Sequence, residues 1–361
     1  MKIAFFSPNW DLYSETFIRA QFDNLPFELT LFTGGYLPTL YLNKQSDELE
    51  ELSKYKKWWE GGRPALWLER ALKAQRVDLI LVQYGLTGAE IMRTAAKLNI
   101  PFMVHFHGFD AYRDDVMSTY QTRYLEMFQK VAAVVSVSHD MCTRLLTLGC
   151  PEEKVHYLPY GVDATFFTPA EDAGAYFLSC GRFVEKKGPL LTLEAFSRVR
   201  SNFPEARLRM IGDGPLLEAA RNLADEMGLN AHVDFLGVLP PDRVAKEMRN
   251  AFCFLQHSKT TSDHDSEGTP LAILEASATG LPIVATRHAG IVDVVEDKRS
   301  GLLVKEGDVV EMANCMETLL NDPLKAKQLG VRGREIILEK FQQSHYLAAL
   351  SQLIERCYLN R

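Results

Sequence analysis

The sequence predicts an α/β protein made of two doubly wound domains, each built on a parallel sheet. The chain has 361 residues, which is too many for one ordinary core and suits two domains of about 150 to 200 residues each. Short apolar runs alternate with amphipathic stretches almost throughout, and the second half repeats the scheme of the first. Near-continuous apolar strands separated by helices are typical of parallel sheets that helices cover on both faces.

The expected elements follow this alternation along the chain. In the first half, strands are predicted at 2–6, 28–33, 77–83, 102–105, 131–137 and 156–158, with helices such as 115–130 and 139–148 between them. In the second half, strands are predicted near 176–180, 207–211, 233–236, 251–255, 283–286 and 302–304. The helices between those strands are expected at 189–202, 215–227, 241–250 and 270–279.

The boundary between the two domains is expected at about residues 160–174. Tyr160–Asp163 has the pattern of a turn, and Thr168–Gly174 has the composition of a linker. We therefore predict an N-terminal domain over 1–165 and a C-terminal domain over 170–340.

The composition excludes several classes of protein. With 47% hydrophobic and 24% charged residues, the chain has the profile of a soluble globular protein. Its net charge of −7 argues against general nucleic-acid binding, which requires a basic surface. No stretch approaches the ~20 apolar residues of a membrane span, and the apolar run at 2–6 is too short for a signal peptide. Six scattered cysteines without a Cys-x-x-Cys pair are expected to be buried free thiols, which fits a cytoplasmic protein.

Two loops of the second half combine glycine with the start of a helix, at the strand ends where doubly wound sheets bind ligands. The loop Gly181–Gly188 places Arg182 and a lysine beside a helix that opens at Pro189, a natural site for phosphate oxygens. A solvated charged turn is the alternative. The loop Gly212–Pro215 permits close backbone approach to a ligand, although plain turn chemistry explains it equally well.

The third loop, Glu267–Pro270, is the most informative one. Thr269 is expected to cap the following helix and Pro270 to take its first position, so that the next amides point outward. Glu275 lies ~8 Å further along the helix axis than Pro270, at 1.5 Å per residue. Glu267 and Glu275 therefore suit the two ends of an extended ligand with several hydroxyls and phosphate between them. The alternative is a helix with an incidental acidic residue.

Polar residues also follow strands in the first half. His107 comes directly after the strand at 102–105, and Gly108 permits close approach of a ligand, although a lone histidine is more often structural. The first loop, Ser7–Thr16, precedes a helix that Ser14 is expected to cap.

Two further segments allow alternative interpretations. Asp263-His264-Asp265 is similar to a metal-binding Asp-x-Asp pair, but short acidic loops are usually solvated, and we expect no metal there. Lys54–Trp59 is a basic aromatic patch that suits an anionic membrane surface or stacking on a sugar. A partly packed helix with exposed lysines is the alternative.

The motifs of the second half occur in one order and spacing that resembles a known family. They are Gly181–Gly188, Gly212–Pro215, Phe235–Gly237, Glu267–Glu275, Ala276–Thr286 and Ser300–Val304. The set resembles glycosyltransferase family 4, retaining enzymes of GT-B fold that use nucleotide sugars. The resemblance covers most of the chain and is strongest at 155–310. It implies two Rossmann-like domains that face each other across a cleft, with the C-terminal helix at 344–361 returning to the first domain.

The resemblance also implies roles for particular residues. Arg182 and Lys187 would hold and neutralise the donor diphosphate, Glu275 the ribose hydroxyls and Glu267 those of the transferred sugar. His107 would approach that sugar from the N-terminal domain, and the backbone at 237–239 would face the base. The donor contacts implied in this way are Gly181, Gly212, Val238, Leu239, Gly268, Thr269, Pro270, Leu271, Ala272 and Glu275.

The first loop departs from the family pattern. Many members have a Gly-Gly pair there, whereas this chain has no glycine between Ser7 and Thr16. The run at 14–18, Ser-Glu-Thr-Phe-Ile, instead resembles a subset that acts in polysaccharide assembly. Ser14 and Thr16, together with Asp110 of the His107 loop, are therefore assigned to the acceptor or phosphate side.

The function that the resemblance implies is retaining transfer of a hexosyl group from a nucleotide sugar, with UDP-hexose favoured. The acceptor would be a hydroxyl of a glycan, a lipid-linked sugar or a small metabolite, and no metal or other cofactor is expected. The protein would be cytoplasmic, with peripheral contact to the inner face of a membrane as an option. A nucleotide-sugar epimerase and a non-catalytic nucleotide-sugar-binding module are the alternatives.

Overall fold

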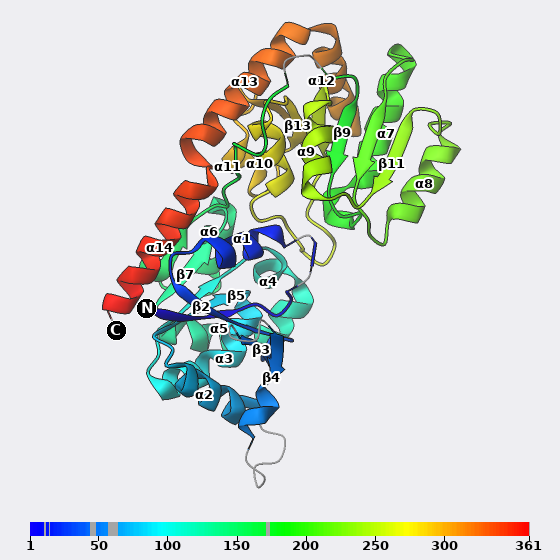
Figure 1. Ribbon diagram of the computed structural model, residues 1–361. Helices are drawn as coiled ribbons and strands as arrows, with labels where there is room; N and C mark the ends of the chain where they lie inside the picture. Colours follow the sequence, from blue (N-terminus) through cyan, green and yellow to red (C-terminus); the bar gives the residue numbers. More distant parts are fainter. Residues whose placement is uncertain (11, 14, 44–47, 57–63, 171–173, 361) are drawn as a thin grey trace. The chain divides into compact units, whose positions relative to one another are not determined.

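The computed structural model describes residues 1–10, 12–13, 15–43, 48–56, 64–170 and 174–360. They form two compact units (Figure 1). Unit 1 comprises Met1–Pro159 and Leu347–Arg361, and unit 2 comprises Tyr160–Tyr346. No helix in the described chain is long and apolar enough to cross a membrane.

The sheet of unit 1 contains, within the described residues, eight strands in the order β4-β3-β2-β1-β5-β6-β7-β8. Their bounds are β1 (Lys2–Phe6), β2 (Glu28–Thr33), β3 (Leu40–Asn43), β4 (Glu48–Glu51), β5 (Leu79–Gln83), β6 (Phe102–His105), β7 (Ala133–Ser136) and β8 (Val155–Tyr157). All neighbouring pairs from β2 to β8 are parallel. The strand order reverses between β1 and β5, which is where doubly wound sheets bind ligands.

One end of this sheet differs from the expected all-parallel arrangement. β3 pairs antiparallel with β2, and β4 pairs antiparallel with β3. The apolar pattern that predicts the other strands is missing in β4, whose sequence is Glu-Leu-Glu-Glu. A short acidic strand at the edge of a sheet discourages pairing with another chain.

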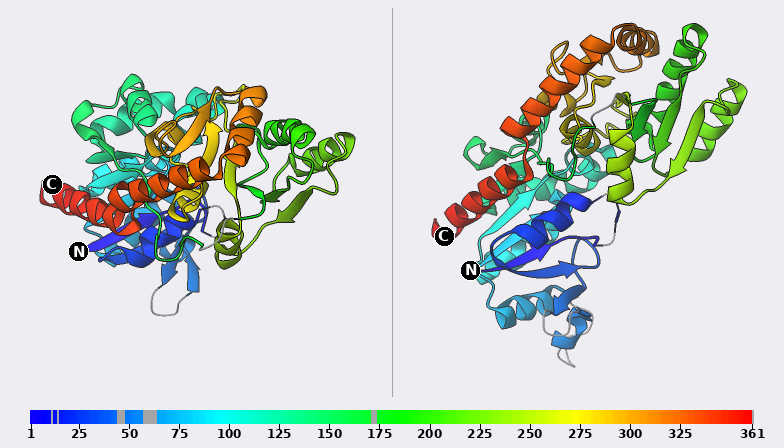
Figure 2. Two further views of the ribbon diagram at one scale, coloured as in Figure 1. Left: turned by 90° about the horizontal axis from the view of Figure 1, so that it is seen from above. Right: turned by 45° about the horizontal axis from the view of Figure 1, so that its top comes forward.

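Helices lie on both faces of this sheet (Figures 1 and 2). Their bounds are α1 (Thr16–Asn24), α2 (Pro64–Gln75), α3 (Gly85–Leu98), α4 (Phe109–Tyr112), α5 (Asp114–Lys130) and α6 (His139–Thr147), with 3-10 turns η1 (Leu52–Tyr55) and η2 (Glu152–Lys154). α6 shows how local chemistry sets a helix start, because the Ser138 hydroxyl accepts a hydrogen bond from the Met141 amide at 3.1 Å.

The sheet of unit 2 is entirely parallel, with the order β11-β10-β9-β12-β13-β14 among the residues described. Its strands are β9 (Phe177–Cys180), β10 (Leu208–Ile211), β11 (Val233–Gly237), β12 (Cys253–Gln256), β13 (Ile283–Thr286) and β14 (Gly301–Val304). The order reverses between β9 and β12. The loops that follow these two strands therefore begin side by side at one edge of the sheet.

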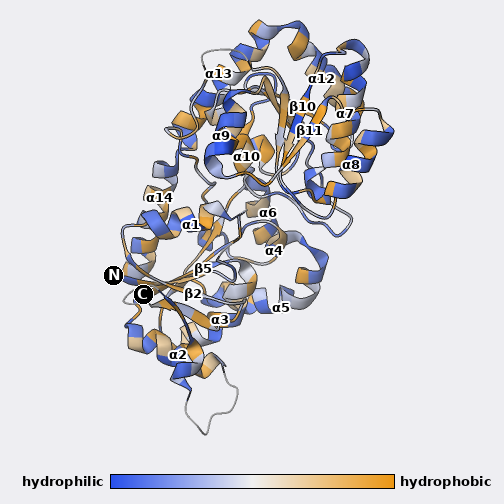
Figure 3. Cartoon of the chain, turned by 45° about the vertical axis from the view of Figure 1, so that its right-hand side comes forward, coloured by the Kyte–Doolittle hydropathy of each residue, from blue (hydrophilic) through white to orange (hydrophobic). Residues whose placement is uncertain are grey.

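The helices of unit 2 bury apolar faces against this sheet. Its strands are largely hydrophobic, as their orange colour in Figure 3 shows. They are α7 (Pro189–Asn202), α8 (Leu217–Glu226), α9 (Pro241–Arg249), α10 (Leu271–Ala278), α11 (Ile291–Val294), α12 (Val309–Asn321), α13 (Pro323–Lys340) and the start of α14 (Gln343–Leu359), with the turn η3 (Glu185–Lys187). Phe177, Phe196 and Met312 are among the fully buried residues of this core.

The units divide between Pro159 and Tyr160, at the start of the region 160–174 where the boundary was expected. Residues 160–167 group with unit 2, where hydrogen bonds with the segment 334–342 hold their backbone. Val162 forms a parallel bridge with Gln342, and the Arg334 guanidinium donates to the carbonyl of Phe167 at 3.1 Å. At the other end of the chain, residues from Leu347 onward group with unit 1, within helix α14.

Candidate active site

Three loops of unit 2 meet at the carboxyl edge of its sheet, and two glycines permit their close approach. Gly188 has φ +55°, and a Cβ there would lie 2.0 Å from the carbonyl oxygen of His257. Gly212 has φ +131°, and a Cβ there would lie 2.0 Å from the carbonyl oxygen of Gly181. Only glycine fits both requirements. The loops after β9, β10 and β12 are therefore in backbone contact.

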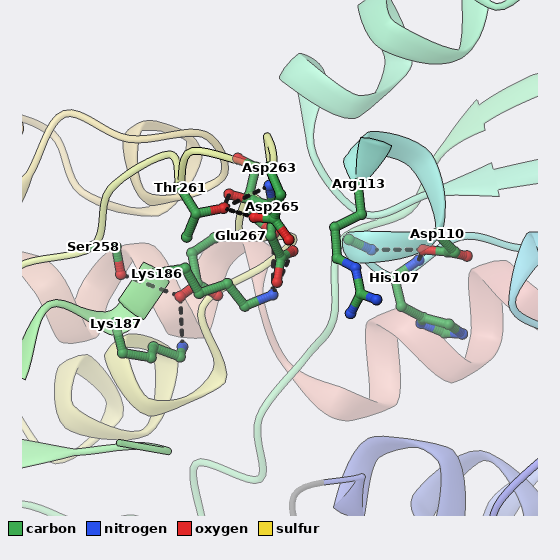
Figure 4. Close-up of polar contacts among 12 residues, drawn as sticks. His107, Asp110, Arg113, Lys186, Lys187, Ser258, Thr261, Asp263, Asp265 and Glu267 are labelled. Atoms are coloured by element: carbon green, nitrogen blue, oxygen red, sulfur yellow. Dashed lines mark hydrogen bonds and ion pairs between the residues drawn. The ribbon is translucent and has the colours of Figure 1, made fainter. Parts of the chain in front are cut away.

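Lys187 and Glu267 form an ion pair at the meeting point of these loops. The Lys187 Nζ lies 2.8 Å from Glu267 Oε1, and the Ser258 hydroxyl donates to the same oxygen at 3.1 Å (Figure 4). Burial of the Glu267 carboxyl favours its neutral form, but the charges of Lys187 and Lys186 outweigh burial and lower its pKa to about 2. Glu267 is therefore ionised at neutral pH and unsuited to proton transfer.

Arg182 lies on the same loop as Lys187, and its side chain is exposed. Within the described chain its guanidinium takes part in no hydrogen bond or ion pair. Arg182 and Lys187 line one hollow together with Cys180, Gly181 and Gln256. Helix α7 begins at Pro189 beside this hollow, and a helix N-terminus attracts anions. The arrangement suits a phosphate group.

Glu275 lies in α10, as its spacing from Glu267 requires. Its side chain is half-buried, and burial raises the pKa of its carboxyl to about 7, with the charge of Lys187 acting in the opposite direction. Glu275 and Lys187 are thus electrostatic neighbours. The protonation state of Glu275 changes near neutral pH.

The start of α10 differs from the expected capping arrangement. The helix begins at Leu271, so Pro270 occupies the cap position and no side chain makes a capping hydrogen bond. The predicted capping role of Thr269 is therefore wrong. Its hydroxyl instead accepts a hydrogen bond from the Tyr160 amide at 3.4 Å. The first intrahelical bonds come from Ile273 and later residues, and helix geometry leaves the amides of Leu271 and Ala272 available to a ligand.

The residues assigned to the base of the donor follow β11. Gly237 ends this strand with φ +67°, and its carbonyl accepts a hydrogen bond from the Gly212 amide at 2.8 Å. This bond brings the loop after β11 next to the loop after β10. Val238 is 46% exposed and Leu239 is half-buried, so both side chains are accessible to a ligand. Both suit contact with a flat apolar ring.

The acidic loop at 263–265 is held by other side chains of unit 2. The buried Lys186 forms an ion pair with Asp265 at 3.0 Å and donates to the Ser266 carbonyl at 3.3 Å (Figure 4). The Thr261 hydroxyl donates to Asp263. These contacts give both carboxylates a role in shaping the loop that leads to Glu267.

Asp110, in unit 1, is fully buried and accepts hydrogen bonds from backbone amides with both carboxylate oxygens. One oxygen accepts from the amides of His107 and Gly108 at 2.9 Å each, and the other from Gly85 at 2.9 Å. Burial raises its pKa to about 6, although these amides lower it. The geometry supports a role in shaping the His107 loop, not the direct contact with acceptor or phosphate that the sequence suggested.

His107 lies at the end of β6 in a cluster of rings. Its imidazole is 4.4 Å from the Tyr84 ring and 4.6 Å from the His105 ring, measured between centroids. Burial, with a smaller contribution from His105, lowers the pKa of His107 well below its usual value. The ring is therefore neutral at physiological pH and offers hydrogen bonds instead of charge.

The remaining predicted residues are only partly described. Ser14 and the segment 57–63 lie outside the described residues. Thr16 is the exposed first residue of α1, where Glu15 occupies the cap position without a side-chain capping bond. Lys54 forms an ion pair with Glu50, so its charge is partly neutralised.

His288 and Glu306 were not identified from the sequence. His288 contacts the backbone of Glu267, and Glu306 contacts His288. His288 Nε2 accepts a hydrogen bond from the Glu267 amide at 3.2 Å, and His288 Nδ1 lies 2.6 Å from Glu306 Oε1. These residues follow β13 and β14. The rule that ligand-site residues follow strands would have pointed to them, but no familiar motif marks them.

Two family models together match most of the chain. The model described as "Glycosyltransferase Family 4" matches residues 18–166, and the model described as "Glycosyl transferases group 1" matches residues 164–336.

Individual proteins show the same relationship. The chain is 31% identical over 291 residues to the "Putative colanic acid biosynthesis glycosyltransferase WcaL" of Escherichia coli (strain K12), covering 78% of this chain and 71% of that protein. It is 30% identical over 234 residues to a "GDP-mannose-dependent alpha-(1-6)-phosphatidylinositol monomannoside mannosyltransferase" of Mycolicibacterium smegmatis, 61% of each chain. Among solved structures, Anabaena Alr3699/HepE in complex with UDP-glucose superimposes with a TM-score of 0.77 at 16% identity, over 100% of both chains.

The two α/β units and the structural neighbour show a GT-B fold, and the family models and the sequence relatives identify a glycosyltransferase. The chain belongs to glycosyltransferase family 4. Membership favours a transferase over the epimerase and the non-catalytic binding module.

Proposed function

We propose that this enzyme transfers a hexosyl group from a nucleotide sugar to a hydroxyl acceptor with retention at the anomeric carbon. One observation carries the proposal. Lys187 and Arg182 line a single hollow beside the N-terminus of α7, and Lys187 is paired with one carboxylate and electrostatically coupled to a second. Cations for a diphosphate thus lie next to acceptors for sugar hydroxyls.

In this proposal Lys187 and Arg182 stabilise the leaving group. Negative charge grows on the diphosphate oxygen as its bond to the anomeric carbon breaks, and fixed cations lower the energy of that state. Lys187 is held in place by Glu267 before the donor binds, so little reorganisation is needed. Arg182 is exposed and adds a planar, two-pronged donor for phosphate oxygens.

The two carboxylates take different hydroxyls. Ser258 and Lys187 both contact Oε1 of Glu267, which leaves Oε2 to accept hydrogen bonds from the transferred sugar. Glu275, with a pKa of about 7, can accept or donate and is assigned to the ribose. The amides of Leu271 and Ala272 are assigned to the sugar and phosphate, and the backbone from Gly237 to Leu239 to the base.

Unit 1 is assigned the acceptor side from the family resemblance. His107 is proposed to contact the transferred sugar, and its low pKa makes hydrogen bonding the contribution to expect. Thr16, exposed at the start of α1, stays a candidate for acceptor or phosphate contact together with Ser14. Membrane contact through the segment 54–59 is likewise a prediction.

The names of the relatives support a role in building a polysaccharide or glycolipid. The Escherichia coli relative is named for colanic acid biosynthesis, and the Mycolicibacterium relative for transfer from GDP-mannose. We favour a UDP-hexose as donor. GDP-mannose is a second candidate, because the relative that uses it shares 30% of the aligned residues.

The test is a donor screen with UDP-, GDP- and ADP-sugars that records both thermal stabilisation and release of nucleoside diphosphate. We expect one nucleotide sugar to raise the melting temperature and to be consumed, faster when acceptor glycans are added. If no nucleotide sugar stabilises the protein or is turned over, the proposed function is wrong. Isomerisation of the donor without transfer would favour the epimerase instead.

A further inference from the structure

Glu267 is held by a second set of contacts that does not touch the hollow of the proposed donor site. These contacts come from the loops after β12, β13 and β14, three neighbouring strands of the unit 2 sheet. His288 follows β13 and is 2% exposed, whereas Glu306 follows β14 and has a 34% exposed side chain. Both residues are outside the roles assigned above.

The hydrogen bonds of His288 fix which of its nitrogens carries the proton. The Glu267 amide can only donate, so the Nε2 that lies 3.2 Å from it must be an acceptor. The proton of the neutral ring is then on Nδ1, where it is donated to Glu306 Oε1 at 2.6 Å. The Ser266 hydroxyl, 3.2 Å from Nε2, is a second donor to the same nitrogen. A proton on Nε2 would face the amide of Glu267 and break this contact.

Glu306 needs both of its oxygens to support this arrangement. Oε1 accepts from His288, and Oε2 accepts from the amide of Thr260 at 2.9 Å. A neutral glutamine has only one oxygen, so it must lose the Thr260 bond or present its amide group to His288. In the second case His288 Nδ1 becomes an acceptor and its proton moves to Nε2. Replacing this one carboxylate therefore disturbs the backbone of Glu267 from a distance.

We propose that Glu306 and His288 form a positioning relay that locks the backbone of Glu267, and with it the carboxylate that selects the transferred sugar. The proposal rests on the proposed function, because it assigns Glu267 to the sugar. The side-chain contacts of Glu267 with Lys187 and Ser258 fix one of its oxygens. The relay fixes the backbone from which that side chain extends. Neither residue of the relay is itself a catalytic residue.

The relay predicts a separation between binding of the nucleotide and binding of the sugar. The probes are the nucleotide sugar that the wild-type enzyme consumes fastest among UDP-glucose and GDP-mannose, and the matching diphosphate, UDP or GDP. For Glu306→Gln and His288→Ala we expect the Kd of the diphosphate to stay unchanged. We expect kcat to fall about tenfold, and the ratio of diphosphate Kd to nucleotide-sugar Kd, which measures the affinity contributed by the sugar, to fall about tenfold as well. His288→Gln, whose amide oxygen can accept from the Glu267 amide, should recover part of that loss.

Glu335→Gln is the matched control, because it removes a carboxylate from an ion pair with Arg332 on α13 of the same unit, and it should behave as wild type. The relay is refuted by wild-type turnover in Glu306→Gln, or by equal losses of diphosphate and nucleotide-sugar affinity. If His288→Ala does not fold, Glu306→Gln decides the question, since its side chain is partly exposed. Failure of the proposed function itself would show separately, as absence of turnover by the wild-type enzyme.

Discussion

The surroundings of each carboxyl group in the candidate site set its charge near neutral pH. Glu267 and Glu275 are two carboxyl groups eight residues apart in the sequence. Their environments set them apart, because Lys187 and Lys186 lower the pKa of Glu267 to about 2 and burial raises that of Glu275 to about 7. The charge of Glu267 is therefore constant near neutral pH, whereas the charge of Glu275 changes there. The contrast matches two carboxylates that bind different parts of one ligand.

Glu275→Gln tests this assignment through stability and activity together. The pKa of Glu275 is about 4.3 in the unfolded chain and about 7 in the folded protein. Its carboxyl therefore destabilises the folded state increasingly as the pH rises between these two values. We therefore expect the melting temperature of Glu275→Gln to match wild type near pH 4 and to exceed it at pH 8. Transfer should fall by about 10²-fold, because the amide offers the ribose hydroxyls one acceptor oxygen in place of two. Equal stability at both pH values, or full activity, contradicts the assignment.

Glu267→Gln should have the opposite effect on stability. Because the pKa of Glu267 is lowered in the folded state, its contribution is present above the unfolded pKa and is lost as pH falls towards about 2. The substitution leaves the charge of Lys187 without its partner. We expect a cost of about 3 kcal/mol at pH 7, measured by urea unfolding, that shrinks below pH 4. A cost that does not depend on pH would assign the loss to packing instead.

At the scale of elements, the site depends on loops that approach more closely than a side chain allows. Gly188→Ala would place a Cβ atom 2.0 Å from the carbonyl oxygen of His257. Because this distance is too short, the loops after β9 and β12 would have to move apart. We expect a loss of at least about 3 kcal/mol in the stability of unit 2, together with loss of donor binding. Urea unfolding and donor-induced thermal shift measure the two effects.

Gly228→Ala provides the control for this substitution. Gly228 also has a positive φ, +67°, but a Cβ there would meet nothing within 4 Å. Its substitution isolates the backbone strain of a left-handed residue, about 1 kcal/mol, and should leave donor binding intact. Similar effects at the two positions would mean that close approach of the loops is unimportant.

Element types could be read from the sequence wherever strands are apolar and buried. The strand expected at 207–211 is β10, Leu208–Ile211, and the helix expected at 189–202 is α7 with the same bounds. The edge strand β4 was missed because its sequence, Glu-Leu-Glu-Glu, has no apolar run to detect. Its neighbour β3 was missed because its apolar run, Leu40–Leu42, is only three residues long. The start of α10 was wrong because a tertiary contact, from Tyr160 to Thr269, occupies the side chain expected to cap it.

The candidate site could be predicted only as far as local sequence determines it. Arg182, Lys187, Glu267 and Glu275 lie in loops and a helix whose positions follow from strand order. Contacts between segments that are distant in the sequence could not be predicted in this way. Asp110 seemed available to a ligand until the structure showed its oxygens bonded to three amides. The link from Glu306 through His288 to Glu267 joins three loops and emerges only from their folded arrangement.

For the molecule as a whole, we expect transfer to need no divalent metal. The cations of the loop after β9 are placed to neutralise the diphosphate, and Asp265 is already paired with Lys186. Turnover of the full chain in excess EDTA should stay within about twofold of that in magnesium, a difference below 0.5 kcal/mol in barrier. Loss of activity in EDTA that added metal restores would contradict this expectation.

The most direct test of the account is the release of nucleoside diphosphate by Lys187→Ala, measured with the preferred nucleotide sugar at saturation. Lys327→Ala, which removes an exposed lysine on α13, is the control. If Lys187 stabilises the departing diphosphate, its removal should lower kcat by about 10²- to 10³-fold, with the protein still folded and Lys327→Ala unaffected. Diphosphate release by Lys187→Ala at the wild-type rate would contradict the assignment of the donor site.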